Sequence, residues 1–357
     1  MKIRGWTIAA AIITIALLGS NTAIKQTPYV LAYPASFGNR INIPEDNPLT
    51  KEGVALGRSL FYETKLSAGN KISCSSCHLQ QLAFTDGKPR STGVDGVAGE
   101  RNSMSLANLL WVRNFFWDGR MPSLEDQAIF PLTASHEMAQ SMEVSAAKLK
   151  ATTQYPAMFQ AAFGSPEIDE KTITKALAQF ERTLISADSR YDQYINGTYT
   201  PDSAERHGLK LFMTAPVPER NIRGANCAHC HGGPKFFLEL FHNNGLDSIP
   251  VDAGREKHTG MLADKGRFRV PTLRNIAVTA PYMHDGRFNT LEEVLDHYSE
   301  HIQESATLSP VLRQTSNTSG SHSLRLTATE KKDIIAFLHL LTDSSFLTNP
   351  AFSNPNN

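Results

Sequence analysis

The stretches Cys74-Ser-Ser-Cys77-His78 and Cys227-Ala-His-Cys230-His231 are two copies of the pattern Cys-x-x-Cys-His. This spacing lets two thiols add to the vinyl groups of one porphyrin while the adjacent imidazole ligates the iron. The two copies use all four cysteines of the chain. A disulfide or a thiol redox motif needs no histidine after its second cysteine, and a zinc knuckle would need further ligands. The sequence therefore predicts two covalently bound c-type haems.

Each motif lies between two helical segments. Gly57-Arg-Ser-Leu60-Phe61 ends a helical pattern 17 residues before Cys74, and Gly208-Leu-Lys-Leu211-Phe212 ends one 19 residues before Cys227. After the first motif, the apolar face of a later helix is formed by Ile173, Leu177, Phe180 and Leu184. After the second, a capping box at Thr327 and Glu330 opens a helix whose apolar face carries Ile334, Leu338 and Leu341.

An early helix, a haem motif and a late helix are the plan of a cytochrome c fold, and no segment shows the sustained alternation of a strand. The sequence thus predicts a mostly α protein with two cytochrome c-like domains, residues 40–195 and 196–345, each holding one haem. Residues 346–357 are rich in Asn, Pro and Ser, a composition that predicts a disordered tail.

Charge and the N-terminus indicate the compartment. The 35 basic and 35 acidic residues cancel, so no overall field favours nucleic acid as a partner. Lys2 and Arg4 precede an apolar run from Gly5 to Ser20, which predicts a signal peptide over residues 1–23, with an uncleaved anchor as the alternative. Export to the periplasm agrees with c-type haem attachment, which bacteria carry out outside the inner membrane.

Several further segments resemble the bacterial dihaem cytochrome c peroxidases and the related MauG proteins. They occur in the family's order and spacing, and the resemblance covers roughly residues 45–345. The segments are Arg101-Asn102-Ser103, Phe116-Trp117-Asp118-Gly119-Arg120, Gln127, His136-Glu137-Met138, Val270-Pro-Thr-Leu-Arg-Asn275 and Thr279-Ala-Pro-Tyr-Met-His-Asp-Gly286.

The resemblance implies a role for several of these residues. Trp117 would relay electrons between the haems, Glu137 would be the acid–base residue for peroxide cleavage, and Gln127 would orient the peroxide. Without the resemblance, the sequence would predict that Trp117 is a core aromatic residue beside Phe115 and Phe116, and that Glu137 is a solvated surface acid. The family also places a calcium ion between its domains, and the matching oxygen donors are Asn102, Thr279 and Pro281.

The sixth ligand of the first haem departs from the common family pattern. Many dihaem peroxidases place a histidine there, from the loop that follows the first motif. Here no histidine occurs between His78 and His136, and the loop has Val94 at the aligned position. We therefore expect a first haem that is five-coordinate or water-bound in the resting ferric state. His136 is a rival ligand, although its place beside Glu137 favours a pocket or surface role.

The sixth ligand of the second haem also departs from the common pattern. The peroxidases commonly use a methionine seven residues after a leucine that here is Leu291, and that position is Tyr298. Members similar to MauG ligate their second haem with tyrosine, so Tyr298 is the predicted ligand. The competing ligands are His297, Met283 and Met261. His284 is expected to support the haem pocket, and Arg274 and Arg287 are candidate partners of haem propionates or surface residues.

The resemblance implies a periplasmic enzyme that reduces hydrogen peroxide to water. Electrons from a small cytochrome c or a cupredoxin would enter at the second haem and pass through Trp117 to the first. One alternative is an enzyme similar to MauG, which would use high-valent iron to oxidise side chains of a protein partner. A second alternative is a dihaem electron-transfer cytochrome without catalysis. Family members often form homodimers, but no pattern in this sequence points to a particular oligomer.

Overall fold

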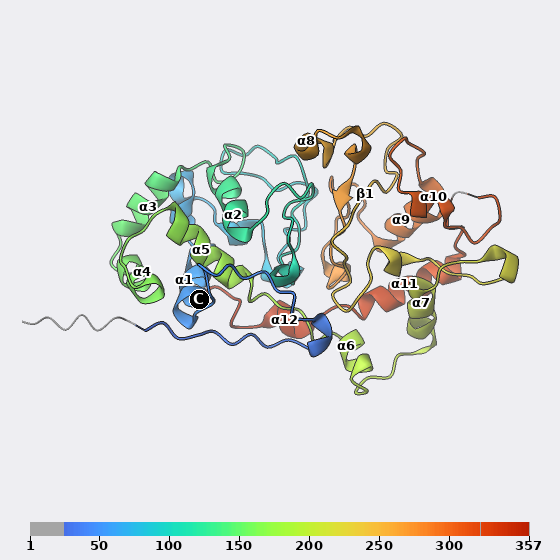
Figure 1. Ribbon diagram of the computed structural model, residues 1–357, viewed down its shortest axis with the longest axis horizontal. Helices are drawn as coiled ribbons and strands as arrows, with labels where there is room; N and C mark the ends of the chain where they lie inside the picture. Colours follow the sequence, from blue (N-terminus) through green and yellow to red (C-terminus); the bar gives the residue numbers. More distant parts are fainter. Residues whose placement is uncertain (1–24, 322, 357) are drawn as a thin grey trace, which may run out of the picture.

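The computed structural model describes residues 25–321 and 323–356, and its fold is mostly helical, as predicted. Two helical lobes lie side by side in Figure 1, and α6 (Arg190–Ile195) lies on the segment that joins them. The first lobe contains α1 (Lys51–Phe61), α2 (Leu124–Thr133), α3 (Met142–Lys150), α4 (Tyr155–Phe163) and α5 (Glu170–Glu181). The second contains α7 (Ser203–Met213), α8 (Glu256–Thr259), α9 (Leu291–Asp296), α10 (Pro310–Gln314) and α11 (Ala328–His339).

The described chain contains little β-structure. Strand β1 (Phe241–His242) pairs antiparallel with β2 (Phe268–Arg269), so that Phe241 lies opposite Arg269. Both strands belong to the second lobe and face the first lobe (Figure 1). Their position matters because Arg269 lies at the junction of the two lobes.

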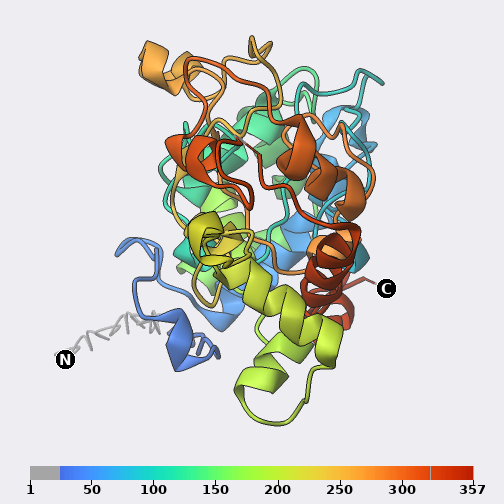
Figure 2. The same cartoon turned by 90° about the vertical axis from the view of Figure 1, so that its right-hand side faces the viewer.

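A glycine lets the first and last helices of each lobe cross closely. An added Cβ at Gly57 of α1 would lie 1.9 Å from the Ala176 carbonyl oxygen of α5. An added Cβ at Gly208 of α7 would lie 1.8 Å from the Asp333 carbonyl oxygen of α11. Figure 2, which looks onto the second lobe, shows α7 beside α11. The internal repeat that the sequence predicts is therefore present as two equivalent helix crossings.

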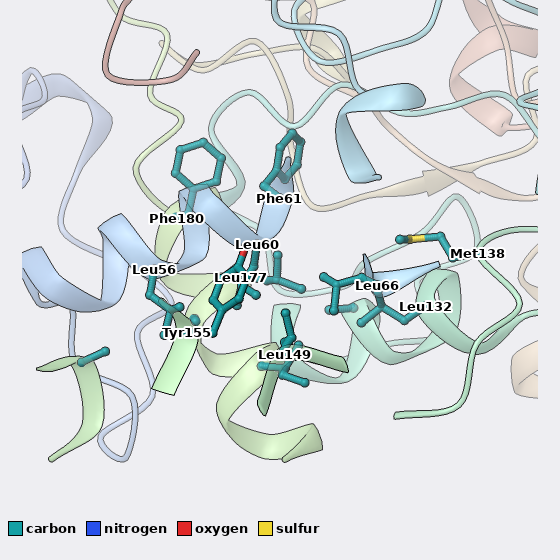
Figure 3. Packing of buried hydrophobic residues seen from close by; sticks show 14 of the residues in the cluster. Leu56, Leu60, Phe61, Leu66, Leu132, Met138, Leu149, Tyr155, Leu177 and Phe180 are labelled. Atoms are coloured by element: carbon teal, nitrogen blue, oxygen red, sulfur yellow. The ribbon is translucent and has the colours of Figure 1, made fainter. Parts of the chain in front are cut away.

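Each lobe has its own apolar core, and a third cluster joins them. Figure 3 shows part of the first core, which includes Leu56, Leu60, Phe61, Leu66, Leu132, Met138, Leu149, Tyr155, Leu177 and Phe180. The second core includes Leu211, Phe212, Phe236, Phe337 and Leu341. The third cluster lies between the lobes and includes Phe37, Leu110, Trp111, Phe237 and Val270. Burial of these apolar faces is the main favourable term in folding.

The prediction of a disordered C-terminal tail was wrong. The chain forms α12 (Ser344–Thr348) after leaving α11 and then ends beside α1 of the first lobe (Figure 1). Phe346 and Phe352 are buried in the first core. The Tyr62 hydroxyl also donates a hydrogen bond of 2.7 Å to the Phe352 carbonyl oxygen. Two buried aromatic rings order a segment whose average composition is polar.

The predicted signal peptide, residues 1–23, lies outside the described residues. Within the part of the chain that the structure describes, no helix is both long and apolar enough to cross a membrane.

Candidate active site and cofactor cavities

Each Cys-x-x-Cys-His motif lines a cavity in its own lobe. Residues Cys74 to Ser76 and Cys227 to His229 each form one turn of 3-10 helix, and the His78 and His231 amides donate back to the first cysteine of their motif at 3.0 and 2.9 Å. The first cavity has a volume of about 510 Å³ and the second about 250 Å³. The first is lined by Cys74, Cys77 and His78, and the second by Cys227, Cys230 and His231.

Both motif histidines are oriented by their Nδ1 atoms. His78 Nδ1 lies 2.7 Å from the Phe84 carbonyl oxygen, and His231 Nδ1 lies 3.1 Å from the Pro271 carbonyl oxygen. A hydrogen bond at Nδ1 leaves Nε2 unprotonated and available to a metal. Burial lowers the pKa of His231 to about 4 and also lowers the pKa of His78. Both imidazoles are therefore neutral, the form that ligates iron.

The four cysteines are free in the described chain and are poor redox thiols. Burial raises the pKa of the Cys227 thiol to about 12 and that of Cys230 to about 11. Burial also raises the pKa of Cys74 and Cys77. Thiol–disulfide exchange requires a thiolate, so this environment disfavours it. Apolar cavities that hold a thiol pair and a neutral imidazole fit covalent haem c.

The predicted acid–base residues line the first cavity. Gln127 lies on α2, whose N-terminus is capped by the Ser123 hydroxyl, and Glu137 follows the end of that helix. The Glu137 side chain is partly buried, with 37% of its surface exposed. This partial burial is the largest influence on its pKa and raises it, while the charges of His136 and Arg120 oppose the rise. The structure thus brings both side chains to the cavity of Cys74 and His78. Their roles stay predictions.

The loop after the first motif packs directly on the Glu137 segment. The Val94 amide donates to the Glu137 carbonyl oxygen at 2.9 Å. A Cβ at Gly93 would lie 2.1 Å from the His136 carbonyl oxygen, so only glycine fits this contact. Ser91, Thr92 and Gly93 line the cavity. The valine side chain cannot ligate iron, whereas His136 lines the same cavity and stays a rival ligand.

Trp117 lies on the wall between the two cavities and lines both. Its Nε1 donates to the Asn102 carbonyl oxygen at 2.9 Å, and its own carbonyl oxygen accepts from the Arg269 amide at 2.7 Å. The first hydrogen bond lies within the first lobe and the second links it to the other lobe. Phe115 lines the first cavity only and is buried in the cluster between the lobes. Trp117 thus lies between the two cavities, and its role as an electron relay stays a prediction.

Two of the four candidate ligands of the second haem line the second cavity. Tyr298, on a single turn of π-helix (His297–His301), and Met283 both do so. The Tyr298 hydroxyl and the Met283 sulfur each lie 3.3 Å from the side-chain nitrogen of Asn244. His297 instead bonds the Asn244 carbonyl oxygen at 3.0 Å, and Met261 is 57% exposed. Burial raises the pKa of Tyr298 to about 12.

His284 lines the second cavity, and its ring stacks on Phe268 with centroids 3.7 Å apart. The two candidate propionate partners are occupied by protein carboxylates. Arg274 is fully buried and donates to both oxygens of Asp192 at 2.8 and 2.7 Å. Arg287 donates to Asp247 at 3.0 Å and also to Asp285. Neither guanidinium is therefore free to bind a propionate.

The three predicted calcium donors fit a hard cation but make no site by themselves. The Asn102 amide donates to the His284 carbonyl oxygen at 2.8 Å, which links it to the segment that contains Thr279 and Pro281. In the described chain, no hydrogen bond reaches the Asn102 side-chain oxygen or the Thr279 and Pro281 carbonyl oxygens. Calcium binds oxygen atoms that are not already occupied by hydrogen-bond donors. These three oxygens are therefore available to it, and the calcium site stays a prediction.

Sequence reasoning missed two buried charged residues at the cavities. Glu181 of α5 lines the first cavity, and burial raises its pKa to about 8. The helix spacing contained this signal, because Glu181 follows Leu177 by four residues on the apolar face. Arg269 lines both cavities and is buried. No sequence pattern indicated it, because its position depends on how the two lobes meet.

Comparison with known proteins gives consistent matches. Residues 51–200 match the family model described as di-haem cytochrome c peroxidase. The methylamine utilization protein MauG of Methylorubrum extorquens is 35% identical over 93% of this chain and 91% of its own. The cytochrome c551 peroxidase of Nitrosomonas europaea is 34% identical over 70% of this chain and 73% of its own.

Solved structures agree. A MauG-like protein associated with microbial copper homeostasis has 36% identity and a TM-score of 0.83, covering 92% of this chain and all of its own. Two helical lobes, each with a Cys-x-x-Cys-His cavity that fits haem c, together with these relatives place the chain in the class of the c-type haem oxidoreductases. Within that class, the chain belongs to the dihaem cytochrome c peroxidase and MauG family.

Proposed function

We propose that this protein reduces hydrogen peroxide to water at the first cavity. One observation carries the proposal: Glu137, a carboxyl group whose pKa is raised by burial, lines the same cavity as Cys74, Cys77 and His78. The haem held by these three residues would supply the iron that binds peroxide and the electrons that cleave it. The second haem would be held by the corresponding residues of the other motif.

The side chains of the first cavity would manage the protons. Reduction of one peroxide consumes two electrons and two protons and gives two waters. Glu137 would take the proton from one peroxide oxygen and return it to the other, a task that a carboxyl of raised pKa performs near neutral pH. Gln127 would orient the peroxide, because its amide both donates and accepts hydrogen bonds. Arg120 and His136, whose charges lower the pKa of Glu137, would favour its ionised, proton-accepting form.

Electrons would enter at the second lobe and leave it through Trp117, which lines both cavities. The donor would be a small cytochrome c or a cupredoxin in the periplasm. Tyr298 would ligate the second haem, and a calcium ion held by Asn102, Thr279 and Pro281 would stabilise the junction of two haem domains. The domain limits remain those proposed from the sequence, except at the C-terminal tail.

A second candidate function has the same peroxide chemistry and a different electron source. The buried Tyr298 lines the second cavity, and a relative 35% identical over 93% of the chain is named MauG. A tyrosinate ligand stabilises ferric iron relative to a thioether and so disfavours rapid reduction by a small cytochrome. In this candidate the two electrons come from side chains of a protein partner.

The test is peroxide-dependent oxidation of a reduced cytochrome c or cupredoxin by the Glu137→Gln variant. We expect turnover to fall by about 100-fold or more, the usual size of a lost acid–base contribution. Glu143→Gln, on the exposed surface of α3, is the matched control and should keep full turnover. Full activity in Glu137→Gln would contradict the proposed role.

An EPR spectrum of the resting ferric protein separates the remaining possibilities. A high-spin haem beside a low-spin haem supports an open first cavity. Only low-spin haem, both at rest and after one-electron reduction, would mean a six-coordinate electron-transfer cytochrome, and both enzymatic candidates would then be wrong. Peroxide consumption without cytochrome oxidation would favour the protein-oxidising candidate.

A further inference from the structure

The buried arginines of the described chain differ in how their charge is compensated. Arg182 donates to both carboxylate oxygens of Glu125 at 2.7 and 2.8 Å, and Arg274 is paired with Asp192 in the same way. Arg269 is only 6% exposed, yet it forms no ion pair with any carboxylate of the described residues. Its Nε atom also has no hydrogen-bond partner there.

The contacts that Arg269 does make are weak. One terminal nitrogen lies 3.6 Å from the Met104 sulfur, a poor acceptor. The charge of Glu239 reaches the guanidinium, but the two groups form no ion pair: one Glu239 oxygen accepts hydrogen bonds at 3.2 Å from the Arg113 amide and the Asn114 side chain, and the other is buried without a partner. A guanidinium cannot escape burial by losing its proton. A buried charge without a hydrogen-bonded partner is unfavourable, so this site favours a further anion.

The position of Arg269 indicates where that anion comes from. Arg269 lies on β2 and lines both cavities, as Trp117 does. The Arg269 amide donates to the Trp117 carbonyl oxygen at 2.7 Å, which fixes the strand against the loop of the first lobe. One terminal nitrogen of the guanidinium lies beside the sulfur of Met104, which also lines both cavities, so the guanidinium belongs to the wall between them.

We propose that Arg269 is the shared counter-ion of two haem propionates, one from each cavity. The proposal rests on the proposed function, because it requires both haems. A guanidinium has five N–H donors in a rigid fork, enough for two carboxylates after the contact with Met104. The two arginines that the sequence suggested for this task, Arg274 and Arg287, are saturated by Asp192, Asp247 and Asp285.

A shared counter-ion has an electrochemical consequence. A positive charge beside a porphyrin favours the reduced state, which carries one more electron, so it raises the reduction potential. Removal of the charge should lower the potentials of both haems. An arginine that lies far from one of the haems has no such paired effect, and the propionate vibrations separate a bonded guanidinium from a charge that acts only through space.

The experiment is a spectroelectrochemical titration of the full-length, haem-loaded Arg269→Met variant. We expect both midpoint potentials to fall, and a tenfold loss in stabilisation of a reduced haem corresponds to 59 mV for one electron. Arg267→Met is the matched control, because Arg267 lies two residues earlier, is paired with Asp264 and lines neither cavity. A fall in only one potential, or in neither, would overturn the shared role.

A second variant covers the case in which Arg269→Met does not fold. Arg269→Lys keeps the charge but not the fork, so the resonance Raman propionate bands of both haems should shift while the potentials stay near the wild-type values. Unchanged propionate bands would overturn the proposal. A haem count by the pyridine haemochrome method separates failure of the proposed function from failure of the role of Arg269. Fewer than two haems in the wild type would contradict both. Two haems with unchanged propionate bands would contradict only the role of Arg269.

Discussion

Glu181 illustrates how one buried carboxyl can affect the whole protein. It is 8% exposed, lines the first cavity, and lies close enough to Cys74 to raise the pKa of that thiol. Burial raises its own pKa from 4.5 to about 8, while the charge of Arg182 opposes the rise. The neutral carboxyl is thus the form that the fold prefers at neutral pH.

We predict that Glu181 makes the stability of the protein decline as pH rises. Its folded pKa lies above its unfolded value of 4.5, so its stabilising contribution is complete below pH 4.5 and is lost as pH rises through about 8. In Glu181→Gln this decline should be smaller, by on the order of a few kcal/mol between pH 5 and pH 8. Urea unfolding at several pH values measures it, with the exposed Glu167→Gln as the control. Parallel profiles for wild type and Glu181→Gln would contradict the prediction.

The second haem offers another prediction for single residues. Tyr298→Phe should change the ferric absorption spectrum of that haem, because an oxygen ligand is lost, and the spectrum of the first haem should not change. Met283→Leu is the matched control, since the Met283 sulfur lies beside the same Asn244 nitrogen. A spectral change in Met283→Leu alone would assign the ligand to the methionine. No change in either variant would leave His297 and Met261 as the candidates.

At the scale of elements, the two helix crossings depend on single glycines. The atom that an added methyl group would meet is a backbone oxygen of the facing helix, 1.9 Å away at Gly57 and 1.8 Å away at Gly208. A backbone oxygen cannot rotate aside as a side chain can, so the helices would have to separate. Each crossing also borders a cavity, so the helix spacing affects how a porphyrin fits.

We predict that Gly57→Ala and Gly208→Ala each destabilise the protein by about 3 kcal/mol, the upper range for overpacking. The gain in helix propensity, about 1 kcal/mol, does not offset this loss. Gly53→Ala on the same helix α1 is the comparison, because its methyl group would meet the side-chain amide of Gln179. That amide is hydrogen-bonded to Asn47 and to the Thr50 amide, but it can rotate where a backbone oxygen cannot, so the substitution should cost less. Chemical denaturation of the haem-loaded variants gives the values. Equal stability of Gly53→Ala and Gly57→Ala would argue against a helix crossing limited by backbone contact.

For the whole molecule, local patterns could be predicted and long-range ones could not. The haem motifs, the capping box at Thr327 and the repeated glycines are contained in short stretches, so the sequence predicted the helices on either side of each motif. The resemblance to the family, and not a local pattern, placed Gln127 and Glu137 at one cavity. The tail was mispredicted because its average composition conceals two buried aromatic rings. Arg269 had no sequence signal because its surroundings come from both lobes. Contacts between distant segments are set by tertiary packing, which composition and periodicity do not report.

The C-terminal segment also joins the two lobes mechanically. Asp343 is 1% exposed and one of its oxygens accepts hydrogen bonds from the Ser186 hydroxyl and from the Ala187 and Asp188 amides. Its own amide donates to Asn275 at 2.8 Å. The chain therefore passes from α11 of the second lobe through a buried carboxylate into the core of the first. Unfolding of one lobe should therefore destabilise the other lobe through this link.

We predict that the lobes unfold together and that the tail helps to hold them. Phe346→Ala removes a buried ring from the first core and should lower stability by about 3–5 kcal/mol. The loss of stability should appear in the spectra of both haems as one unfolding transition at a lower midpoint, because Asp343 couples the tail to the second lobe. Ser344→Ala, exposed on the same α12, should leave the transition in place. Separate transitions for the two haems in Phe346→Ala would mean that the lobes fold independently and that the tail stabilises only the first.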